Sequence, residues 1–384
     1  MKLDPPTTLR RLAVTGADGF VGWHLRCRIK AMSPQTEFTT IDRDDFADPA
    51  TLRARLRGVD GVVHLAGANR GSDEEVHATN VTLATEIVAA LRDVAATPTL
   101  VYVNTIHADR SSAYGRSKKQ AAHLLTAWGD RVGAPVTDLR LPNLFGECGR
   151  PHYNSAVATF CHELARGESS YVDPAGSTEL LHVQAACALV LAALESPVVG
   201  TQRVEGTQLG IPEVYGRLQR LAAGYHDARL PELIDRLDLQ LFNQLRTAMF
   251  PARYPLPLAG HVDSRGMFAE AARGYGATQT SYSITKLGVT RGEHFHLDKV
   301  ERFVVVSGSA VIRLRKLFSR DVVSFEVSGD HPVAVDMPPL FAHDITNIGK
   351  SDLVTLFWAN DHFDAASPDT YPEPVAPRKT EQLV

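Results

Sequence analysis

Two groups of residues, far apart in this 384-residue chain, have the types and spacing that catalysis requires. The first is a glycine-rich stretch at residues 15–22, Thr-Gly-Ala-Asp-Gly-Phe-Val-Gly, followed further along by Tyr-Gly-Arg-Ser-Lys at residues 114–118. The second consists of three histidines and a glutamate, side chains that bind transition metals: His294, His296, Glu301 and His343. The first group is typical of a reductase that uses a dinucleotide, and the second of a metal-binding β-barrel.

The glycine-rich stretch lies where a predicted strand meets a predicted helix. Glycine permits the tight turn and lets backbone N–H groups approach a pyrophosphate, while the helix N-terminus adds partial positive charge. Because the glycines follow a strand and precede a helix, we interpret them as a dinucleotide site rather than a structural turn. The residues expected to line this site are Gly16, Asp18, Gly19, Phe20, Val21 and Gly22.

The identity of the dinucleotide depends on the end of the second predicted strand. An acidic residue there binds the ribose hydroxyls of NAD, whereas a nearby arginine pairs with the 2′-phosphate of NADP. Asp42 and Arg43 are both present, so the residues leave NAD and NADP open. The loop after the next strand is expected to border the adenine and its ribose through Leu65, Ala66 and Gly67.

Tyr114 and Lys118 are spaced by four residues and would share one face of a helix. A lysine ammonium lowers the pKa of a nearby phenol and holds the nicotinamide ribose, so the tyrosine can protonate a carbonyl oxygen as hydride arrives. A third hydroxyl usually stabilises the substrate oxygen. Thr105, at the end of the preceding strand, is the candidate, with Ser111 and Ser112 as alternatives.

The spacing of the second group resembles the first cupin motif, which here runs from Gly288 to Gly308. In a strand, His294 and His296 would point to the same side, separated by one pleat. The barrel would then bring Glu301 into the same cavity.

The second cupin motif is partial. Pro338, His343 and Asn347 fit it, but Leu340 stands where the family usually has glycine. Three imidazoles and one carboxylate suit a divalent metal such as Zn, Ni, Fe or Mn, and we expect zinc. Whether the ion would be catalytic or structural stays open.

The elements that must position the first group alternate between strands and helices. Apolar segments predict strands at residues 11–15, 37–42, 61–66 and 99–104. Helical periodicity is found at residues 20–31, 50–56 and 83–94. Strands that are apolar on both faces and alternate with helices indicate a parallel, Rossmann-type α/β sheet with right-handed crossovers.

The pattern changes near residue 255, where residues 253–260 are rich in proline. We therefore expect a reductase domain at 1–255, a cupin domain at 256–375 and an irregular tail at 376–384. In the second domain, alternation predicts strands at residues 281–287, 301–306, 310–317, 322–327, 331–336 and 353–359. Closely spaced antiparallel strands suggest a small β-barrel or jelly roll.

Length and composition agree with two globular domains. Hydrophobic residues make up 44% and charged residues 22% of the chain, as in soluble proteins. The net charge of −4, without blocks of like charge, argues against a nucleic-acid or membrane partner. The four cysteines lack a disulfide-framework pattern, and we find no signal peptide or long apolar run, so we expect a cytoplasmic enzyme.

The first domain resembles extended short-chain dehydrogenase/reductases that act on nucleotide sugars. Residues 140–146, Arg-Leu-Pro-Asn-Leu-Phe-Gly, are similar to an element of that family in which the asparagine and neighbouring backbone meet the substrate. Residues 151–155, Pro-His-Tyr-Asn-Ser, would then face the sugar nucleotide. The residues assigned to the substrate are Asn69, Arg140, Asn143 and Asn154, although loop capping would also explain the last two asparagines.

From about residue 10 to about residue 375, the chain resembles the CapF/WbjC family of capsular polysaccharide and O-antigen biosynthesis. The nine-residue step from Thr105 to Tyr114 contributes to this resemblance. The other segments that carry it are residues 15–22, 64–70, 153–161, 261–266, 301–308, 327–330 and 368–371.

The resemblance implies a bifunctional homodimer. Its cupin domain would epimerise carbon 3 of a UDP-linked 2-acetamido-2,6-dideoxy-4-hexulose. Its reductase domain would then reduce the 4-ketone with NADPH to UDP-N-acetyl-6-deoxy-L-talosamine, a precursor of N-acetyl-L-fucosamine. The family alignment of Arg43 favours NADP over NAD. A proton next to a ketone is acidic, and a cation near the enolate oxygen would stabilise the enolate.

Some residues depart from the family pattern. Leu297 stands where the family often has a further histidine, and Gln184 replaces an aspartate that is common in extended reductases. Tyr282, His331 and Asp336 are possible acid or base groups of the barrel, and the sequence does not rank them.

Two other functions remain as alternatives. The first keeps the ketoreductase but makes the cupin domain a structural or dimerising module. The second is a sugar-binding or NADP-sensing protein without catalysis, although such a protein would not need Thr105, Tyr114 and Lys118 together.

Overall fold

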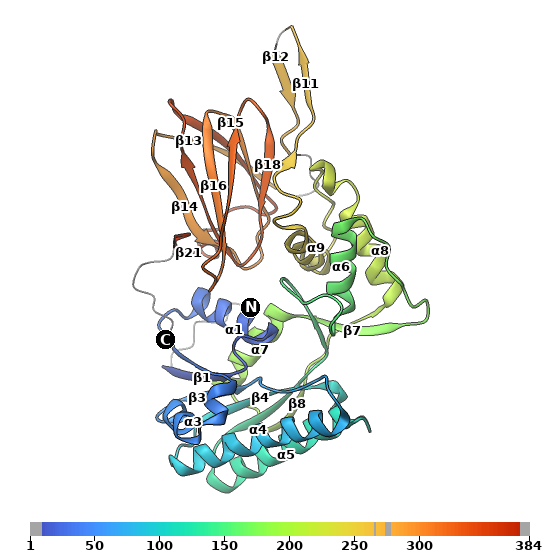
Figure 1. Cartoon of the computed structure of the whole chain (residues 1–384), viewed down its shortest axis with the longest axis vertical. Coiled ribbons are helices and arrows are strands. Elements are labelled where there is room, and N and C mark those ends of the chain that lie inside the picture. The colour runs from blue at the N-terminus through green and yellow to red at the C-terminus, as the bar shows by residue number, and fades with distance from the viewer. Residues whose placement is uncertain (1–9, 265, 273–277, 377–384) are drawn as a thin grey trace. The chain divides into compact units, whose positions relative to one another are not determined.

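The computed structural model describes residues 10–264, 266–272 and 278–376 (Figure 1). The predicted tail therefore lies outside the described residues from residue 377 onward. The chain forms two compact units. Unit 1 comprises Met1–Phe145 and Ser177–Leu209, and unit 2 comprises Gly146–Gly176 and Gly210–Val384.

These units divide the chain differently from the sequence boundary near residue 255. Two helical segments that precede this boundary, residues 146–176 and 210–255, belong by their contacts to the unit that contains the β-barrel. The boundary at 255 stays a proposal about sequence modules.

Unit 1 is built on a six-stranded parallel sheet with the order β2-β1-β3-β4-β5-β8. The strands are β1 (Arg11–Thr15), β2 (Glu37–Ile41), β3 (Gly61–His64), β4 (Thr99–Thr105), β5 (Val136–Leu141) and β8 (Gly200–Arg203). The strand order reverses between β1 and β3, and ligands of open α/β sheets bind at the carboxyl ends of the strands at such a point. The predicted Rossmann-type architecture is confirmed.

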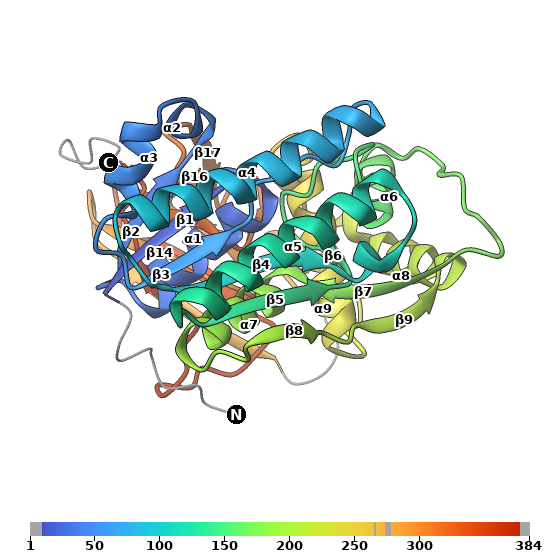
Figure 2. The same cartoon turned by 90° about the horizontal axis from the view of Figure 1, so that it is seen from below.

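Helices cover both faces of this sheet and form two apolar cores. The helices are α1 (Phe20–Met32), α2 (Arg43–Ala47), α3 (Pro49–Leu56), α4 (Asp73–Asp93), α5 (Ala113–Val132) and α7 (Val183–Glu195). Figure 2 shows α4 and α5 side by side along one face. Leu56, Ile87 and Leu125 fill the core on that face, whereas Leu25 and Val190 fill the core under α1 and α7.

Helix α4 begins ten residues before the predicted segment 83–94. Ser72 accepts a hydrogen bond from the backbone N–H of Glu75, and the Glu75 side chain accepts one from the N–H of Ser72. This capping box fixes the helix start, although the first half of the helix is polar.

A short 3₁₀ helix, η1 (Ile106–Asp109), joins β4 to α5, and a small three-stranded sheet completes this part of the chain. Its strands are β6 (Asn143–Phe145), β7 (Ser177–His182) and β9 (Thr207–Gly210).

Unit 2 combines helices with two five-stranded sheets, as expected for a jelly roll. The helices are α6 (Ala156–Arg166), α8 (Ile211–Ala222), the 3₁₀ helix η2 (Tyr225–Asp227) and α9 (Arg236–Met249). One sheet has the order β10-β18-β15-β20-β13, with β10 (Leu256–Pro257), β13 (Gln279–Thr285), β15 (Glu301–Ser307), β18 (Val333–Met337) and β20 (Leu353–Ala359). The other has the order β17-β16-β19-β14-β21, with β14 (Thr290–Phe295), β16 (Ser309–Lys316), β17 (Val322–Ser328), β19 (Phe341–Asn347) and β21 (Tyr371–Pro372).

A separate hairpin pairs β11 (Gly260–Asp263) with β12 (Gly266–Ala269). The list of expected strands omitted this hairpin and also β14 and β19, which carry two of the proposed metal ligands. Positive φ angles at Gly292 (98°) and Glu293 (57°) make a bulge that interrupts the alternation in β14. In β19 the polar residues His343 and Asp344 are as fully buried as their apolar neighbours, which hides the two-residue period.

A buried ion pair between Arg302 and Asp336 joins two barrel strands, with Nε–Oδ1 2.6 Å and Nη2–Oδ2 2.9 Å. The Tyr225 hydroxyl donates to Oδ2 of Asp336 at 2.6 Å and lies 2.7 Å from the hydroxyl of Tyr254. These contacts connect the helical part of unit 2 to the barrel. Asp336 therefore has a structural role in the fold, and Tyr282 is exposed, which leaves neither in the histidine cluster.

None of the helices in the described part of the chain is long and apolar enough to cross a membrane.

Candidate active site and metal centre

The β1–α1 turn has the close backbone approach that a dinucleotide loop requires. Gly16 has φ +67°, and a Cβ on it would lie 3.0 Å from the backbone nitrogen of Ala66. A Cβ on Gly22 would clash with the carbonyl oxygen of Gly16. Helix α1 starts after Gly19, which has no side chain to cap it, so the N–H groups of the first turn remain available to an anion.

Thr15 connects this turn to the loop after β3. Its Oγ1 accepts hydrogen bonds from the N–H groups of Leu65 and Ala66, at 3.1 and 3.0 Å, and lies 2.7 Å from Nδ1 of His64. Burial lowers the pKa of His64 to about 3, so the imidazole is neutral and its Nδ1 can accept the proton of the hydroxyl. The sequence reasoning missed this role of Thr15, although it stands at the start of the glycine motif.

Asn80, on α4, is a second residue that the sequence reasoning missed. Its Oδ1 accepts from the N–H of Ala68 at 2.8 Å, and its Nδ2 donates to the carbonyl oxygen of Ala68 at 2.9 Å. The same Nδ2 lies 2.9 Å from Oγ of Ser117, on α5. Asn80 therefore fixes the loop after β3 against the helix that carries Tyr114.

Tyr114 and Lys118 lie on α5, as predicted, and Ser112 caps this helix by accepting from the N–H of Gly115 at 3.1 Å. The Lys118 ammonium donates to the carbonyl oxygen of Val103 at 3.0 Å and lies 4.1 Å from the centre of the Tyr102 ring.

The electrostatics differ from the expectation that Lys118 lowers the pKa of Tyr114. Burial raises the pKa of Tyr114 above its ordinary value. Burial also lowers the pKa of Lys118 to about 7, although the charge of Asp138 opposes this shift. The lysine is directed to Val103 and Tyr102, which explains why its charge does not dominate at the phenol.

Thr105 ends β4, and its Oγ1 accepts from the N–H of His107 at 3.2 Å, which caps η1. The neighbouring Asn104 connects the parts of this site. Its Oδ1 accepts from the N–H of Thr105 at 2.8 Å, and its Nδ2 donates to the Asp138 carboxylate at 2.6 Å. The hydroxyls of Thr105 and Ser112 thus each cap a helix, and Thr105, at the end of β4, stays the candidate third hydroxyl.

Several predicted cofactor and substrate residues have structural partners. Asp42 caps α2 by accepting from the N–H groups of the two residues that follow Arg43, at 2.8 and 3.1 Å. Asp18 pairs with Arg26 at 2.6 Å. Arg43 itself is exposed.

Arg140 is engaged by two carboxylates, those of Asp138 at 2.9 Å and Asp109 at 2.6 Å. Nδ2 of Asn143 donates to Oγ1 of Thr178 at 3.0 Å. Asn69 lies exposed in unit 1 and Asn154 exposed in unit 2. The assignment of these four residues to the substrate stays a prediction.

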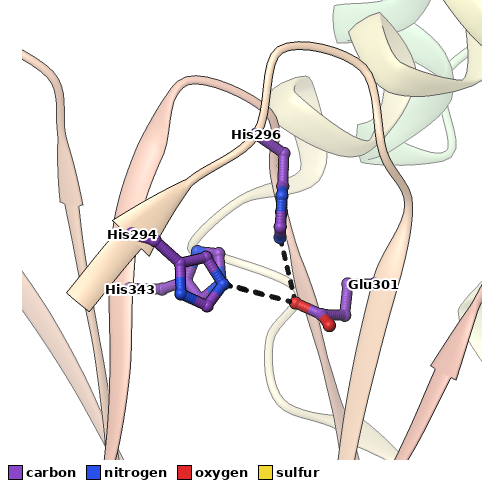
Figure 3. Close-up of side chains that lie close together, drawn as sticks. All are labelled: His294, His296, Glu301 and His343. Atoms are coloured by element: carbon purple, nitrogen blue, oxygen red, sulfur yellow. Dashed lines mark hydrogen bonds and ion pairs between the residues drawn. The ribbon is translucent and has the colours of Figure 1, made fainter. Parts of the chain in front are cut away.

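The four predicted metal ligands meet inside the barrel, as Figure 3 shows. The ligand atoms of the four residues lie within 4.8 Å of one another. Oε2 of Glu301 is 3.0 Å from Nε2 of His296, 3.5 Å from Nε2 of His343 and 4.0 Å from Nε2 of His294. The bulged strand β14 ends at Phe295, so His296 lies just beyond the strand rather than within it.

Backbone carbonyl groups hold two of the imidazoles in a defined orientation. Nδ1 of His296 lies 2.5 Å from the carbonyl oxygen of Asp369, and Nδ1 of His343 lies 3.1 Å from that of Phe341. A carbonyl oxygen accepts only, so each Nδ1 carries the proton and each Nε2 presents a lone pair to the cluster.

Charges in the cluster favour the forms that bind a metal. Burial lowers the pKa of His343 to about 4, which keeps its imidazole neutral. Although burial raises it, the three neighbouring imidazoles hold the pKa of Glu301 well below its ordinary value. The cluster therefore presents a neutral imidazole at His343 and an ionised carboxylate at Glu301.

Two family models match this chain, one in each half. Residues 12–205 match the NAD dependent epimerase/dehydratase family, and residues 261–371 match the polysaccharide biosynthesis C-terminal domain. A curated relative from Pseudomonas aeruginosa, UDP-2-acetamido-2,6-beta-L-arabino-hexul-4-ose reductase, is 31% identical over 366 residues. That match covers 94% of this chain and 98% of the relative.

Solved structures give the same family. The capsular polysaccharide assembling protein CapF from Staphylococcus aureus is 31% identical with a TM-score of 0.59, over 95% of this chain and 100% of that chain. RMD from Pseudomonas aeruginosa, solved with NADPH, is 21% identical with a TM-score of 0.54, over 63% of this chain and 98% of that chain. The second likeness shows the fold alone. The chain thus belongs to the CapF/WbjC family, in which an epimerase/dehydratase-type domain precedes a polysaccharide biosynthesis C-terminal domain.

Proposed function

We propose that this protein reduces the 4-ketone of a UDP-linked 2-acetamido-2,6-dideoxy-hexulose with NADPH, giving UDP-N-acetyl-6-deoxy-L-talosamine. The observation that carries the proposal is the placement of Tyr114 and Lys118 on α5, beside the carboxyl end of β4, in a parallel sheet with a glycine turn after β1. The name of the Pseudomonas aeruginosa relative, a hexul-4-ose reductase, supports the substrate class.

The residues of unit 1 supply what such a reduction needs. A bound nicotinamide cofactor would supply the hydride to the ketone carbon. Tyr114 would give its phenolic proton to the ketone oxygen, and the Thr105 hydroxyl would hydrogen-bond that oxygen. The positive charge of Lys118 would stabilise the phenolate that remains and bind the cofactor ribose. Arg43, exposed after β2, favours NADP, although Asp42 keeps NAD as an alternative.

We also propose that the histidine cluster binds a divalent metal, with zinc preferred. Nε2 of His296 and Oε2 of Glu301 lie 3.0 Å apart, and both atoms are hydrogen-bond acceptors when Nδ1 carries the proton. Such a pair requires a proton or a cation between its atoms, and three imidazoles with a carboxylate form a usual zinc ligand set. His294, His296, Glu301 and His343 would hold the ion.

The proposed duty of the barrel is the epimerisation of carbon 3 before reduction. The metal would supply positive charge to an enolate oxygen. The keto sugar can re-epimerise, so a reductase in the same chain would trap the product. A structural or dimerising barrel is the second candidate, since carbonyl-locked imidazoles also suit an ion that only fixes strands. The proposal includes a homodimer, which light scattering would test.

The test uses the full chain with NADPH and a panel of UDP- and dTDP-linked 4-keto-hexoses. NMR of the products should show a reduced carbon 4 with the UDP-linked 2-acetamido sugar, and no turnover of any 4-keto sugar would overturn the reductase. For the barrel, the His294→Ala/His296→Ala variant should stop the entry of solvent deuterium at carbon 3. Normal exchange in a folded, metal-free variant would leave the barrel a structural module.

A further inference from the structure

The segment at residues 368–371, Pro-Asp-Thr-Tyr, has so far entered only through the carbonyl oxygen of Asp369, which lies beside His296. It lies against the loop that connects His296 to Glu301, although about 70 residues of chain separate the two. Asp369 makes the hydrogen bonds from this segment to His296 and to the loop that follows it. Its position in the fold, immediately before β21, places it beside the end of β14.

The Asp369 carboxylate accepts three consecutive backbone N–H groups of this loop. Oδ1 accepts from Leu297 at 2.9 Å, and Oδ2 accepts from Asp298 at 3.0 Å and from Lys299 at 2.8 Å. These are charge-assisted hydrogen bonds, which are stronger than those between neutral groups. Together they hold the backbone between two proposed metal ligands in one conformation.

The backbone of Asp369 holds the first of these ligands directly. Its carbonyl oxygen lies 2.5 Å from Nδ1 of His296, which fixes the ring so that Nε2 faces the cluster. The residue has a φ of +43°, in the left-handed region that aspartate and asparagine tolerate better than most side chains. This conformation turns the carbonyl group towards the imidazole while the carboxylate reaches the loop.

The surrounding chain fixes Asp369 in place. Nζ of Lys299 donates to the carbonyl oxygen of Pro368 at 2.7 Å, and Tyr371 pairs with Phe295 across β21 and β14. Further along, buried Arg315 pairs with Glu373 at 2.6 Å. The segment is therefore anchored on both sides of Asp369.

We propose that Asp369 is a positioning residue of the metal centre, which holds His296 through its carbonyl group and the His296–Glu301 loop through its carboxylate. The role rests on the proposed metal site. Groups that orient metal ligands in this way usually contribute about 10–100-fold to metal affinity. Removal of the carboxylate should release the loop and loosen His296, without removing any ligand.

The test compares two substitutions at Asp369 with a matched control. Asp369→Asn keeps the size and the left-handed backbone but presents an NH₂ group to backbone N–H donors. Asp369→Gly removes the carboxylate and eases the positive φ. The control is Asp364→Asn, an exposed residue nearby whose Oδ1 accepts from the N–H of Ala366 at 2.8 Å, outside the cluster.

The measurements are zinc affinity, by competition with a chelating dye, and the absorption spectrum of the cobalt-substituted full-length protein. We expect both Asp369 variants to bind zinc about 10–100-fold more weakly and to show an altered cobalt spectrum, while the control matches the wild type. Unchanged affinity and spectrum in Asp369→Asn would overturn the role, as would an equal loss in the control.

Two further results are distinguishable. A wild-type protein that binds neither zinc nor cobalt would overturn the proposed metal site, and this role with it. If Asp369→Gly fails to fold, Asp369→Asn decides the matter, because it preserves the shape of the side chain and its circular dichroism can be matched to the wild type before the titration.

Discussion

The hydroxyl of Thr15 lies 2.7 Å from Nδ1 of the buried His64, at the place where the two predicted cofactor loops meet. The same oxygen accepts the N–H groups of Leu65 and Ala66. One hydroxyl thus sets the distance between the glycine turn and the loop after β3.

We therefore expect Thr15→Val to weaken NADPH binding and to lower the free energy of unfolding by ~1–3 kcal/mol, because two partly buried N–H groups lose their acceptor. Thr15→Ser keeps the hydroxyl and should stay close to the wild type. NADPH fluorescence titration and thermal unfolding would measure both effects. Equal behaviour of the valine and serine variants would show that the hydroxyl is not needed.

The phenol of Tyr114 is the proposed proton donor. Tyr114→Phe should lower kcat for the 4-keto sugar by ~10²–10⁴-fold while NADPH still binds, since the ring remains and only the proton is lost. Tyr171→Phe is a suitable control, because Tyr171 is 86% exposed. Steady-state rates and NADPH titration would separate the two steps, and a Tyr114 variant with normal turnover would exclude the proposed acid.

The charge of Lys118 should make cofactor binding depend on pH. Burial lowers its pKa to about 7, so the positive charge that attracts the anionic cofactor is lost as pH rises through that value. We expect the Kd for NADPH to increase between pH 6 and pH 8.5 in the wild type and to change much less in Lys118→Met.

The lowered pKa of Lys118 also makes the free energy of unfolding depend on pH. The unfolded chain keeps the proton of Lys118 up to its ordinary pKa of roughly 10.4, whereas the folded protein releases it near pH 7. The unfolded state binds more protons between these values, so this residue destabilises the fold at low pH and this penalty fades as pH rises. Denaturant unfolding of the wild type and Lys118→Met across this range would reveal the difference; parallel curves would contradict the assignment.

Leu340 stands where the cupin family usually has glycine, and its φ is +65°. Its side chain is fully buried, and its N–H donates to the carbonyl oxygen of His296 at 2.8 Å. Loss of a buried leucine costs ~2–5 kcal/mol, whereas relief of the left-handed conformation returns only ~1–2 kcal/mol. Leu340→Gly should therefore destabilise the protein.

The comparison with alanine gives the sharper test. Leu340→Ala keeps the backbone strain, so the glycine variant should be the more stable by about 1 kcal/mol. At Leu353, a buried residue of β20, the order should reverse, because glycine in a strand is less favourable than alanine. Urea unfolding of the four variants would measure their free energies of unfolding. If glycine and alanine ranked in the same order at both positions, the positive φ of Leu340 would not explain the difference.

Secondary structure and motif positions could be predicted from the sequence where the local residue pattern agrees with the fold. The strands at Arg11–Thr15 and Leu353–Ala359 have the predicted bounds, because continuous apolar or alternating residues end at clear turn signals. The Tyr-x-x-x-Lys spacing placed both residues on α5. The four spaced ligands of the cupin motif meet in one cluster.

Prediction failed where side chains bind groups distant in the sequence. Nothing near Thr15 or Asn80 indicates the loop contacts that they make, because the partners lie 12 to 51 residues away. Arg140, which the sequence assigns to the substrate, also pairs with Asp138 and Asp109, and the motif does not indicate these contacts. Such contacts depend on packing, which a single sequence does not show.

The Arg302–Asp336 pair limits how this chain can be divided. A fragment that begins at residue 256 would keep both charges but lose the Tyr225 and Tyr254 hydroxyls and the carbonyl oxygen of Ala228, to which Arg302 donates at 2.5 Å. A buried ion pair that loses its additional hydrogen bonds lowers the stability of the fold, because the cost of desolvating the charges is no longer offset. Residues 225–254 therefore contribute buried hydrogen-bonding groups to the barrel. A fragment that folds on its own must include these residues as well as the barrel strands.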